Sequence, residues 1–304
     1  MPSEHAVLAF QIGALMVRNH NMTIRIVTDS TSDIPPETAA EYGITVVPVY
    51  VNIGDVSYLD GIELSRTEFY QNLPDYPSPP TTAAPAPGSF TETYNRLAEE
   101  GATHVLSVHL ASTLSGMLNA ARLGSEATDA VQVTLFDSQQ LTMGLGLQAL
   151  TAAEAAVAGC SVTEIVDLLT ERVKRTYVLG LLDTLEYLRR SGRVNWAQFG
   201  IGTLLRIKPI LQVHLGKVEM LERIRTSKRA LGRFLELAAD LEPMEKLALL
   251  YINATQKEIE TFRQQTQFLV PQGTTPLAVE LTPAIGAHIG PGGLGIACVT
   301  INDR

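Results

Sequence analysis

Two patterns of hydrophobic and polar positions follow one another along the chain. Between residues 22 and about 160, short apolar runs alternate with segments of helical spacing. Strands separated by helices indicate a parallel sheet, with ligand groups at the carboxyl ends of the strands. After about residue 175 the pattern changes, because 207–224 predicts two strands joined at a tight turn, a β-hairpin. The predicted strands of the first part are 24–29, 44–51, 103–110 and 131–136.

This change divides the chain into two predicted lobes. An α/β lobe covers residues 22–165 and an α+β lobe covers residues 166–304, with the boundary placed in the interval from 160 to 176. The Pro-rich stretch 74–89 predicts an irregular loop. Capping boxes predict three helix starts, and they pair Ser65 with Glu68, Ser89 with Glu92, and Ser161 with Glu164.

Residues 1–21 are expected to lie outside this fold as a leader segment. Their apolar stretch, residues 5–17, is interrupted by Gln11 and is too short to span a bilayer. No positively charged segment precedes it, so it is a poor signal peptide. Because no export signal is recognisable, the cytoplasm is the expected compartment.

Composition narrows the class of protein. The hydrophobic fraction of 45% and charged fraction of 18% are typical of a compact folded chain. The net charge of −9 argues against binding to a nucleic-acid backbone. Cys160 and Cys298 are the only cysteines, which excludes a Cys-rich zinc module and argues against a disulfide-stapled secreted scaffold.

The stretch 104–121 contains the clearest candidate site. An apolar run ends at Leu110 and is followed by small and hydroxyl residues, which predicts a strand turning into a helix. Open N–H groups at such a turn favour an anion, although Ser and Thr that only cap the helix are the alternative interpretation. The turn contains no GxGxxG and no phosphate loop. Its candidate residues are Ser112, Thr113, Ser115 and Gly116.

Two Asp-Ser pairs also follow predicted strands. Asp29 and Ser30 begin the polar run 29–33, and Asp137-Ser138 ends the fourth strand. Because the carboxyl ends of parallel strands meet at one edge, these pairs suggest a polar crevice. A helix cap formed by the residues of 29–33 is the alternative.

Two further candidates lie in the second lobe. A helix that ends at Gly192 is expected to have its last carbonyls satisfied by Arg189 and Arg190, which leaves Arg193 to point at an anion. In the segment 281–295, five glycines and two prolines surround His288. We interpret this segment as a loop that allows close approach of a ligand, with a structural histidine as the alternative.

No catalytic set emerges from the sequence. Ser115 lacks a GxSxG elbow, and neither an HExxH motif nor a clustered set of metal ligands is present. We therefore assign no catalytic residue, no metal and no cofactor. The residues indicate a site that binds an anion.

Six motifs, in order and from Met22 to nearly the C-terminus, resemble the DegV family of bacterial fatty-acid-binding proteins. Each motif alone is weak evidence for the resemblance, but six motifs in the order of the family are specific evidence. They are VTDSTSDIP (27–35), ASTLSGMLNAA (111–121), FDS (136–138), LEYLRRSGRV (185–194), IKPIL (207–211) and IGAHIGPGGLG (285–295).

The resemblance implies a two-lobed fold with one long-chain fatty acid, such as palmitate, in a cleft between the lobes. It also implies a partner, a fatty acid kinase that phosphorylates the presented carboxylate. By motif, the carboxylate-binding residues map to Thr82 and Ser115. Supporting residues, or residues on the side of phosphoryl transfer, would be Asp29, Ser30, Ser112, Arg193 and His288.

The chain departs from the family pattern beside two of these positions. The family's usual Thr-Ser-Gln-Pro-Ser is Thr-Ala-Ala-Pro-Ala at 82–86, and Met117 replaces a threonine. Fewer polar neighbours would then serve the carboxylate, which in a dry cleft needs hydrogen bonds to stay ionised.

The leading hypothesis is a non-catalytic lipid carrier without nucleic-acid partners, and peripheral membrane contact for lipid exchange is left open. An acyl or phosphoryl transferase or hydrolase that uses Ser115 or His288 is the alternative. A DNA-binding regulator is a third and weaker hypothesis, because the chain is acidic and contains no convincing helix-turn-helix.

Overall fold

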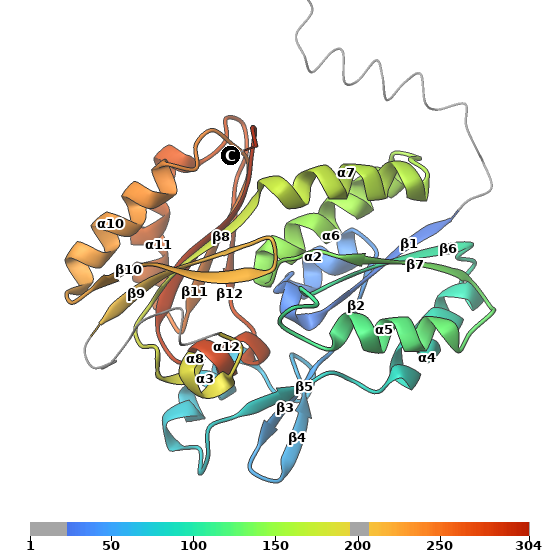
Figure 1. The fold of residues 1–304 in the computed structure, drawn as a ribbon, viewed down its shortest axis with the longest axis horizontal. Coiled ribbons are helices and arrows are strands. Elements are labelled where there is room, and N and C mark those ends of the chain that lie inside the picture. Colours follow the sequence, from blue (N-terminus) through green and yellow to red (C-terminus); the bar gives the residue numbers. More distant parts are fainter. Residues whose placement is uncertain (1–22, 195–206, 304) are drawn as a thin grey trace, which may run out of the picture.

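The computed structural model describes residues 23–194 and 207–303 and arranges them as three β-sheets with flanking helices (Figure 1). The first sheet has four parallel strands in the order β2-β1-β6-β7. The predicted parallel sheet is therefore confirmed. Its strands are β1 (Ile24–Asp29), β2 (Ile44–Val47), β6 (His104–His109) and β7 (Gln132–Asp137).

A six-stranded sheet forms the second lobe, in the order β10-β9-β8-β13-β11-β12. Of the strand pairs described in it, only β11 with β12 is parallel, and β9 and β10 form the expected hairpin. The two-lobed α/β plus α+β architecture is thus confirmed. The strands are β8 (Thr176–Leu182), β9 (Lys208–His214), β10 (Lys217–Ile224), β11 (Met244–Ile252), β12 (Leu277–Glu280) and β13 (Gly293–Thr300).

A small antiparallel sheet, β4-β3-β5, corrects two sequence expectations (Figure 1). The predicted strand 44–51 is two strands in different sheets, because Pro48 cannot donate a ladder hydrogen bond and the chain turns there. The predicted loop 74–89 includes a short strand and the start of a helix. The strands of this sheet are β3 (Tyr50–Ile53), β4 (Val56–Leu59) and β5 (Thr81–Ala83).

Helix α6 (Thr142–Val157) joins the two large sheets. It contacts β1 and β6 on one side and β8, β11 and β13 on the other. Thirteen of its 16 residues are buried, as expected for a helix that is apolar on all faces and lies between layers. Its glycines allow this approach, since a Cβ would lie 2.6 Å from the Ser32 carbonyl oxygen at Gly146 and 2.7 Å from Val178 Cγ2 at Gly144.

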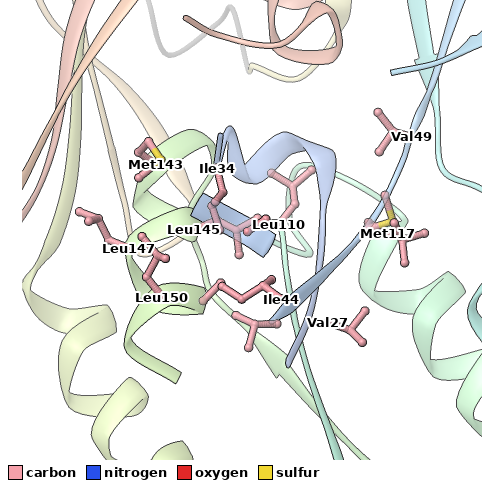
Figure 2. Packing of buried hydrophobic residues seen from close by; sticks show 14 of the residues in the cluster. Val27, Ile34, Ile44, Val49, Leu110, Met117, Met143, Leu145, Leu147 and Leu150 are labelled. Carbon is pink, nitrogen blue, oxygen red and sulfur yellow. The ribbon is translucent and has the colours of Figure 1, made fainter. Parts of the chain in front are cut away.

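One continuous hydrophobic core crosses this joint. Figure 2 shows side chains of α6, such as Leu145 and Leu150, packed among those of Ile34 and Ile44. The same cluster extends to residues of the second sheet, among them Val178. A separate cluster, which includes Phe234, fills the opposite face of that sheet.

The remaining helices cover the sheets or frame the cavity between the lobes. α10 packs on β8, β9 and β10, α4 packs on α5, and α8 packs on α12. The short 3-10 helix η1 follows β1 directly. These elements are η1 (Ser30–Ser32), α2 (Pro36–Glu41), α3 (Arg66–Asn72), η2 (Leu73–Asp75), α4 (Pro87–Glu99), α5 (Met117–Glu126), α7 (Val162–Arg175), α8 (Glu186–Ser191), α10 (Ser227–Ala239), α11 (Gln256–Gln265), η3 (Gln267–Leu269) and α12 (Pro283–Ile289).

The helix-start predictions have mixed outcomes. The box of Ser161 and Glu164 is present in full, and Ser65 accepts the Glu68 N–H. The predicted capping box of Ser89 and Glu92 is wrong, because α4 already begins at Pro87, two residues before Ser89. The fixed φ of proline suits the first helical turn.

The boundary between residues 165 and 166 falls inside α7, and it stays a prediction. The leader 1–21 lies outside the described residues. Within the described ranges, no helix combines the length and apolarity needed to cross a membrane.

Candidate functional site

A cavity of about 200 Å³ lies between the lobes. Its walls come from the six-stranded sheet, from β5 and α12, and from the segment between β6 and α5. Most of the lining is aliphatic, which suits an apolar ligand. The aliphatic residues include Val49, Leu110, Leu114, Val178, Leu182, Leu188, Leu211, Val213, Val218, Leu250, Ile252, Leu281, Ile285 and Ile289.

Two polar residues of this lining, Thr82 and His288, are in contact. The Thr82 Oγ1 and His288 Nε2 atoms are 2.8 Å apart although the residues are 206 positions apart in sequence. Thr82 is held by β5, which pairs with β3 through Val51. The structure therefore brings together two of the residues that the sequence suggested.

His288 lies on helix α12, which corrects the loop expected for 281–295. The helix starts at Pro283, which needs no N–H donor at its first position, and ends at Gly290 with φ of 81°. Strand β13 begins at Gly293. The glycines thus end a helix and begin a strand instead of forming one flexible loop.

The imidazole of His288 is neutral near pH 7. Burial and then the nearby Arg193 cation lower its pKa from 6.5 to about 4. A neutral imidazole has one N–H donor and one acceptor nitrogen. When Nε2 carries the proton, His288 donates to Thr82 Oγ1, and the Thr82 hydroxyl hydrogen points elsewhere.

Ser115 also lines the cavity, at the turn before α5. Its Oγ accepts a hydrogen bond from the Met117 N–H at 3.2 Å. This bond occupies the oxygen as an acceptor and leaves the hydroxyl hydrogen available as a donor. The capping and ligand-binding interpretations of Ser115 are therefore compatible.

Arg193 follows the end of α8 and lines the same cavity. Gly192 adopts a left-handed conformation, with φ of 67°, and the Arg193 guanidinium donates to the Ser191 carbonyl at 2.7 Å. The expectation that Arg190 satisfies a helix carbonyl is wrong, because its guanidinium pairs with Glu186. A second, more open hollow shares Ser115 and Arg193 with the cavity.

Asp29 and Ser30 do not line this cavity. Asp29 is fully buried and accepts hydrogen bonds from His109 Nδ1 at 2.9 Å, from the Leu110 N–H at 3.2 Å and from Thr31. Ser30 Oγ accepts the Val49 N–H at 3.2 Å. Both side chains form hydrogen bonds to other groups of the protein.

Ser112 lines only the open hollow, and its hydroxyl donates to Asp137. All four residues of the two Asp-Ser pairs therefore have protein partners, and none of them lines the cavity or the open hollow. The sequence pattern could not show this in full, because the partners include Thr31 and Gln139 close by in sequence but also His109 and Ser112 from distant segments.

A buried acidic cluster that sequence reasoning missed fixes α12. Asp33 Oδ1 accepts the Thr282 N–H at 2.7 Å, and Asp60 Oδ1 accepts the Ala284 N–H at 3.4 Å. Burial raises the pKa of Asp33 to about 7 and that of Asp60 to about 6. These carboxyl groups hold the start of the helix that carries His288. In the sequence, the one sign of this cluster is Asp33, the second Asp of the motif TDSTSD at 28–33.

Metal binding finds no support in the part of the chain that the structure describes, where no group of three His, Cys, Asp or Glu side chains could hold an ion. The cavity combines the Thr82–His288 pair and the Ser115 hydroxyl with walls that are mostly aliphatic. Such a site suits an amphipathic ligand with an anionic or polar head.

Comparison with known proteins agrees with this class of two-lobed binding protein. A family model described as "Uncharacterised protein, DegV family" matches residues 23–300. The chain is 39% identical over 277 residues to a DegV domain-containing protein of Streptomyces coelicolor, covering 90% of this chain and 97% of the relative. A DegV domain-containing protein of Listeria innocua is 36% identical over 279 residues, covering 91% and 98%. The chain belongs to the DegV family.

Solved structures show the same fold. A DegV family protein from Thermus thermophilus, whose structure is described as one of fatty acid binding, superimposes with a TM-score of 0.83 at 33% identity. That similarity covers 92% of this chain and all of the other. DegV from Bacillus subtilis, described as a fatty acid binding protein, gives a TM-score of 0.82 at 32% identity, covering 91% and 99%.

Proposed function

We propose that this protein binds one long-chain fatty acid in the cavity between its lobes. The observation that carries the proposal is the pairing of Thr82 with neutral His288 on a lining that is otherwise mostly aliphatic. The fatty acids named for the Thermus and Bacillus relatives support the same class of ligand.

The carboxylate is assigned to Thr82 and Ser115. Ser115 Oγ accepts the Met117 N–H and retains a hydrogen to donate, and Thr82 does the same when Nε2 of His288 carries the proton. A carboxylate is an acceptor only, so it needs such donors. Arg193 supplies positive charge near His288, which further favours an anion.

The acyl chain supplies most of the affinity in this proposal. Burial of one methylene is worth ~0.8 kcal/mol, so ten of them would contribute about 8 kcal/mol before the entropic cost of association. The aliphatic lining offers no hydrogen bonds that would favour a polar ligand. The head group therefore sets orientation, and the tail sets binding strength.

We further propose that the protein is a non-catalytic carrier that presents the carboxylate to a fatty acid kinase. The open hollow supports this step, because it shares Ser115 and Arg193 with the cavity and leads outward from the head group. Arg193 and His288 would then serve phosphoryl transfer more than lipid binding, since a guanidinium suits a developing phosphate.

Native mass spectrometry followed by lipid extraction tests the binding proposal. We expect one fatty acid per chain, and uptake of palmitate by delipidated protein. Val218→Glu places a charge in the cavity wall and should abolish uptake, whereas Ile62→Glu, at a residue that is 69% exposed and absent from the lining, should not. Absence of lipid from the purified protein together with no palmitate uptake would refute the proposal.

A further inference from the structure

Three glycines lie together on the wall of the cavity that the six-stranded sheet forms. On β8, Leu179 and Leu181 belong to the core cluster on the outer face of the sheet, so the alternating positions Val178, Gly180 and Leu182 face the cavity. In the neighbouring strand β13, Gly295 lies opposite Gly180, and Gly293 lies opposite Leu182. Directly opposed residues share a face of a sheet. Gly180, Gly293 and Gly295 therefore lie together on the cavity side of the sheet, where none of the three contributes a side chain.

The three glycines are not equally required by the fold. A Cβ at Gly295 would lie 2.7 Å from the carbonyl oxygen of Leu179, and a Cβ at Gly293 would lie 3.0 Å from that of Leu181. Backbone atoms cannot move aside as a flexible side chain can. The close approach of the two strands thus explains glycine at 295 and favours it at 293.

Gly180 has no such explanation. A Cβ there would meet only Leu182 Cδ2, at 3.8 Å, which is an ordinary contact, and Gly180 is not among the glycines with positive φ. A side chain at this position would fit the backbone and would occupy cavity space. Glycine inside a strand weakens it, so the chain forgoes stability here and gains room beside the ligand.

We propose that Gly180 determines which acyl chain lengths the cavity accommodates. This inference rests on the proposed fatty-acid binding and concerns the tail instead of the head group. Gly293 follows α12, the helix that carries His288, by only a short turn, whereas the pair of Gly180 and Gly295 lies one step farther along the strands. Successive positions on one face are about 6.6–6.8 Å apart. A short tail ends before residue 180, and a long tail must pass over it.

The test compares the affinities of delipidated protein for hexanoate, whose extended tail is no longer than this one step, and for myristate, palmitate and stearate. In Gly180→Val, we expect palmitate and stearate to bind at least about 10-fold more weakly while the affinity for hexanoate changes little, as for added methyl groups in a hydrophobic pocket. Gly180→Ala should give a smaller shift in the same direction. Gly232→Ala, on the exposed side of α10 and outside the lining, is the matched control and should leave all four affinities unchanged.

Each outcome decides between distinct conclusions. If wild-type protein binds none of the four acids, the proposed function fails and this inference fails with it. If wild-type protein binds them and Gly180→Val keeps the same ratio of long-chain to short-chain affinity, only the role of Gly180 is refuted. If thermal melting shows that Gly180→Val does not fold, the ratio measured for Gly180→Ala decides the question.

Discussion

His109 and His288 each lie in a small cluster of hydroxyl groups, yet the two clusters differ in what faces the imidazole. The His109 ring contacts the Asp29 carboxylate through Nδ1 and Ser107 Oγ, at 2.7 Å, through Nε2. Ser107 in turn bonds with the Tyr94 hydroxyl at 2.8 Å, and all these side chains are buried. We call this set, Asp29, Tyr94, Ser107 and His109, the closed cluster.

The open cluster consists of Thr82, Ser115, Arg193 and His288, all of which line the cavity. Its histidine faces a cation where the closed cluster has a carboxylate. A bound fatty acid would supply the missing anion. The comparison shows that residue type does not distinguish a histidine enclosed by protein partners from one that lines a cavity, whereas the groups around the ring do.

The largest expected effect comes from breaking the closed cluster. Asp29→Ala leaves His109 Nδ1 and the Leu110 N–H without their acceptor in a buried site. We expect the free energy of unfolding to fall by about 3 kcal/mol or more, measured by urea denaturation. A loss below about 1 kcal/mol would show that the closed cluster is not structural.

The open cluster should respond in the opposite way, with an effect on binding and not on folding. Ser115→Ala and Thr82→Val each remove one donor to the carboxylate. We expect each to weaken palmitate binding by about 1.5–3 kcal/mol in calorimetry, with the urea midpoint little changed. Unaltered palmitate affinity in both variants would remove them from the site.

The closed and open clusters differ in where the partners of their side chains lie in the fold. The sequence predicts the fold in part, but it does not predict these partners. Alternating strands and helices correctly predicted the parallel sheet, and the change of pattern after residue 175 predicted the hairpin of β9 and β10. These features depend on local periodicity. The contact of Asp29 with His109 spans 80 residues, so no local pattern distinguishes its buried carboxylate from a ligand group.

The small sheet and α12 were missed for a related reason. β5 has three residues in a Pro-rich stretch, and β3 stabilises it by pairing across the chain. The Gly- and Pro-rich composition of 281–295 favoured a loop, but Pro283 begins a helix whose start is held by Asp33 and Asp60. In both places tertiary contacts outweigh local preference.

A pH titration of folding stability provides a further test of the open cluster, because the pKa of His288 is lowered in the folded protein. The unfolded chain, in which the histidine pKa is near 6.5, binds a proton between pH 6.5 and 4 that the folded protein does not bind. The contribution of His288 to folding stability therefore falls as the pH falls through this range, whereas the raised pKa values of Asp33 and Asp60 act in the opposite direction. Between pH 7 and pH 5 we expect His288 to contribute a loss of about 1–2 kcal/mol in the ligand-free protein.

The control for this titration is His288→Gln, which has no titratable group at that position. Subtracting its unfolding free energies from those of wild type isolates the His288 contribution. Bound palmitate should reduce the loss, because a carboxylate favours the protonated ring. Identical pH profiles for wild type and His288→Gln would contradict the lowered pKa.

The smallest effect on lipid binding is expected for Arg193. Its guanidinium already donates to the Ser191 carbonyl, so Arg193→Ala should change palmitate affinity by less than about 1 kcal/mol. Phosphorylation of bound palmitate by a fatty acid kinase with ATP should fall by about 10²–10³-fold, as when a stabilising donor is removed from a transition state. Lost lipid with normal phosphorylation per bound lipid would reverse this assignment.

The position of the ligand carboxylate can be tested most directly with palmitate labelled with ¹³C at that carbon. In NMR spectra of the delipidated protein reloaded with this acid, we expect one bound carboxyl resonance per chain. That resonance should shift in Thr82→Val and in Ser115→Ala and stay in place in Ser107→Ala, which alters only the closed cluster. An unchanged chemical shift of the bound resonance in both cavity variants would contradict the assignment of the carboxylate to Thr82 and Ser115.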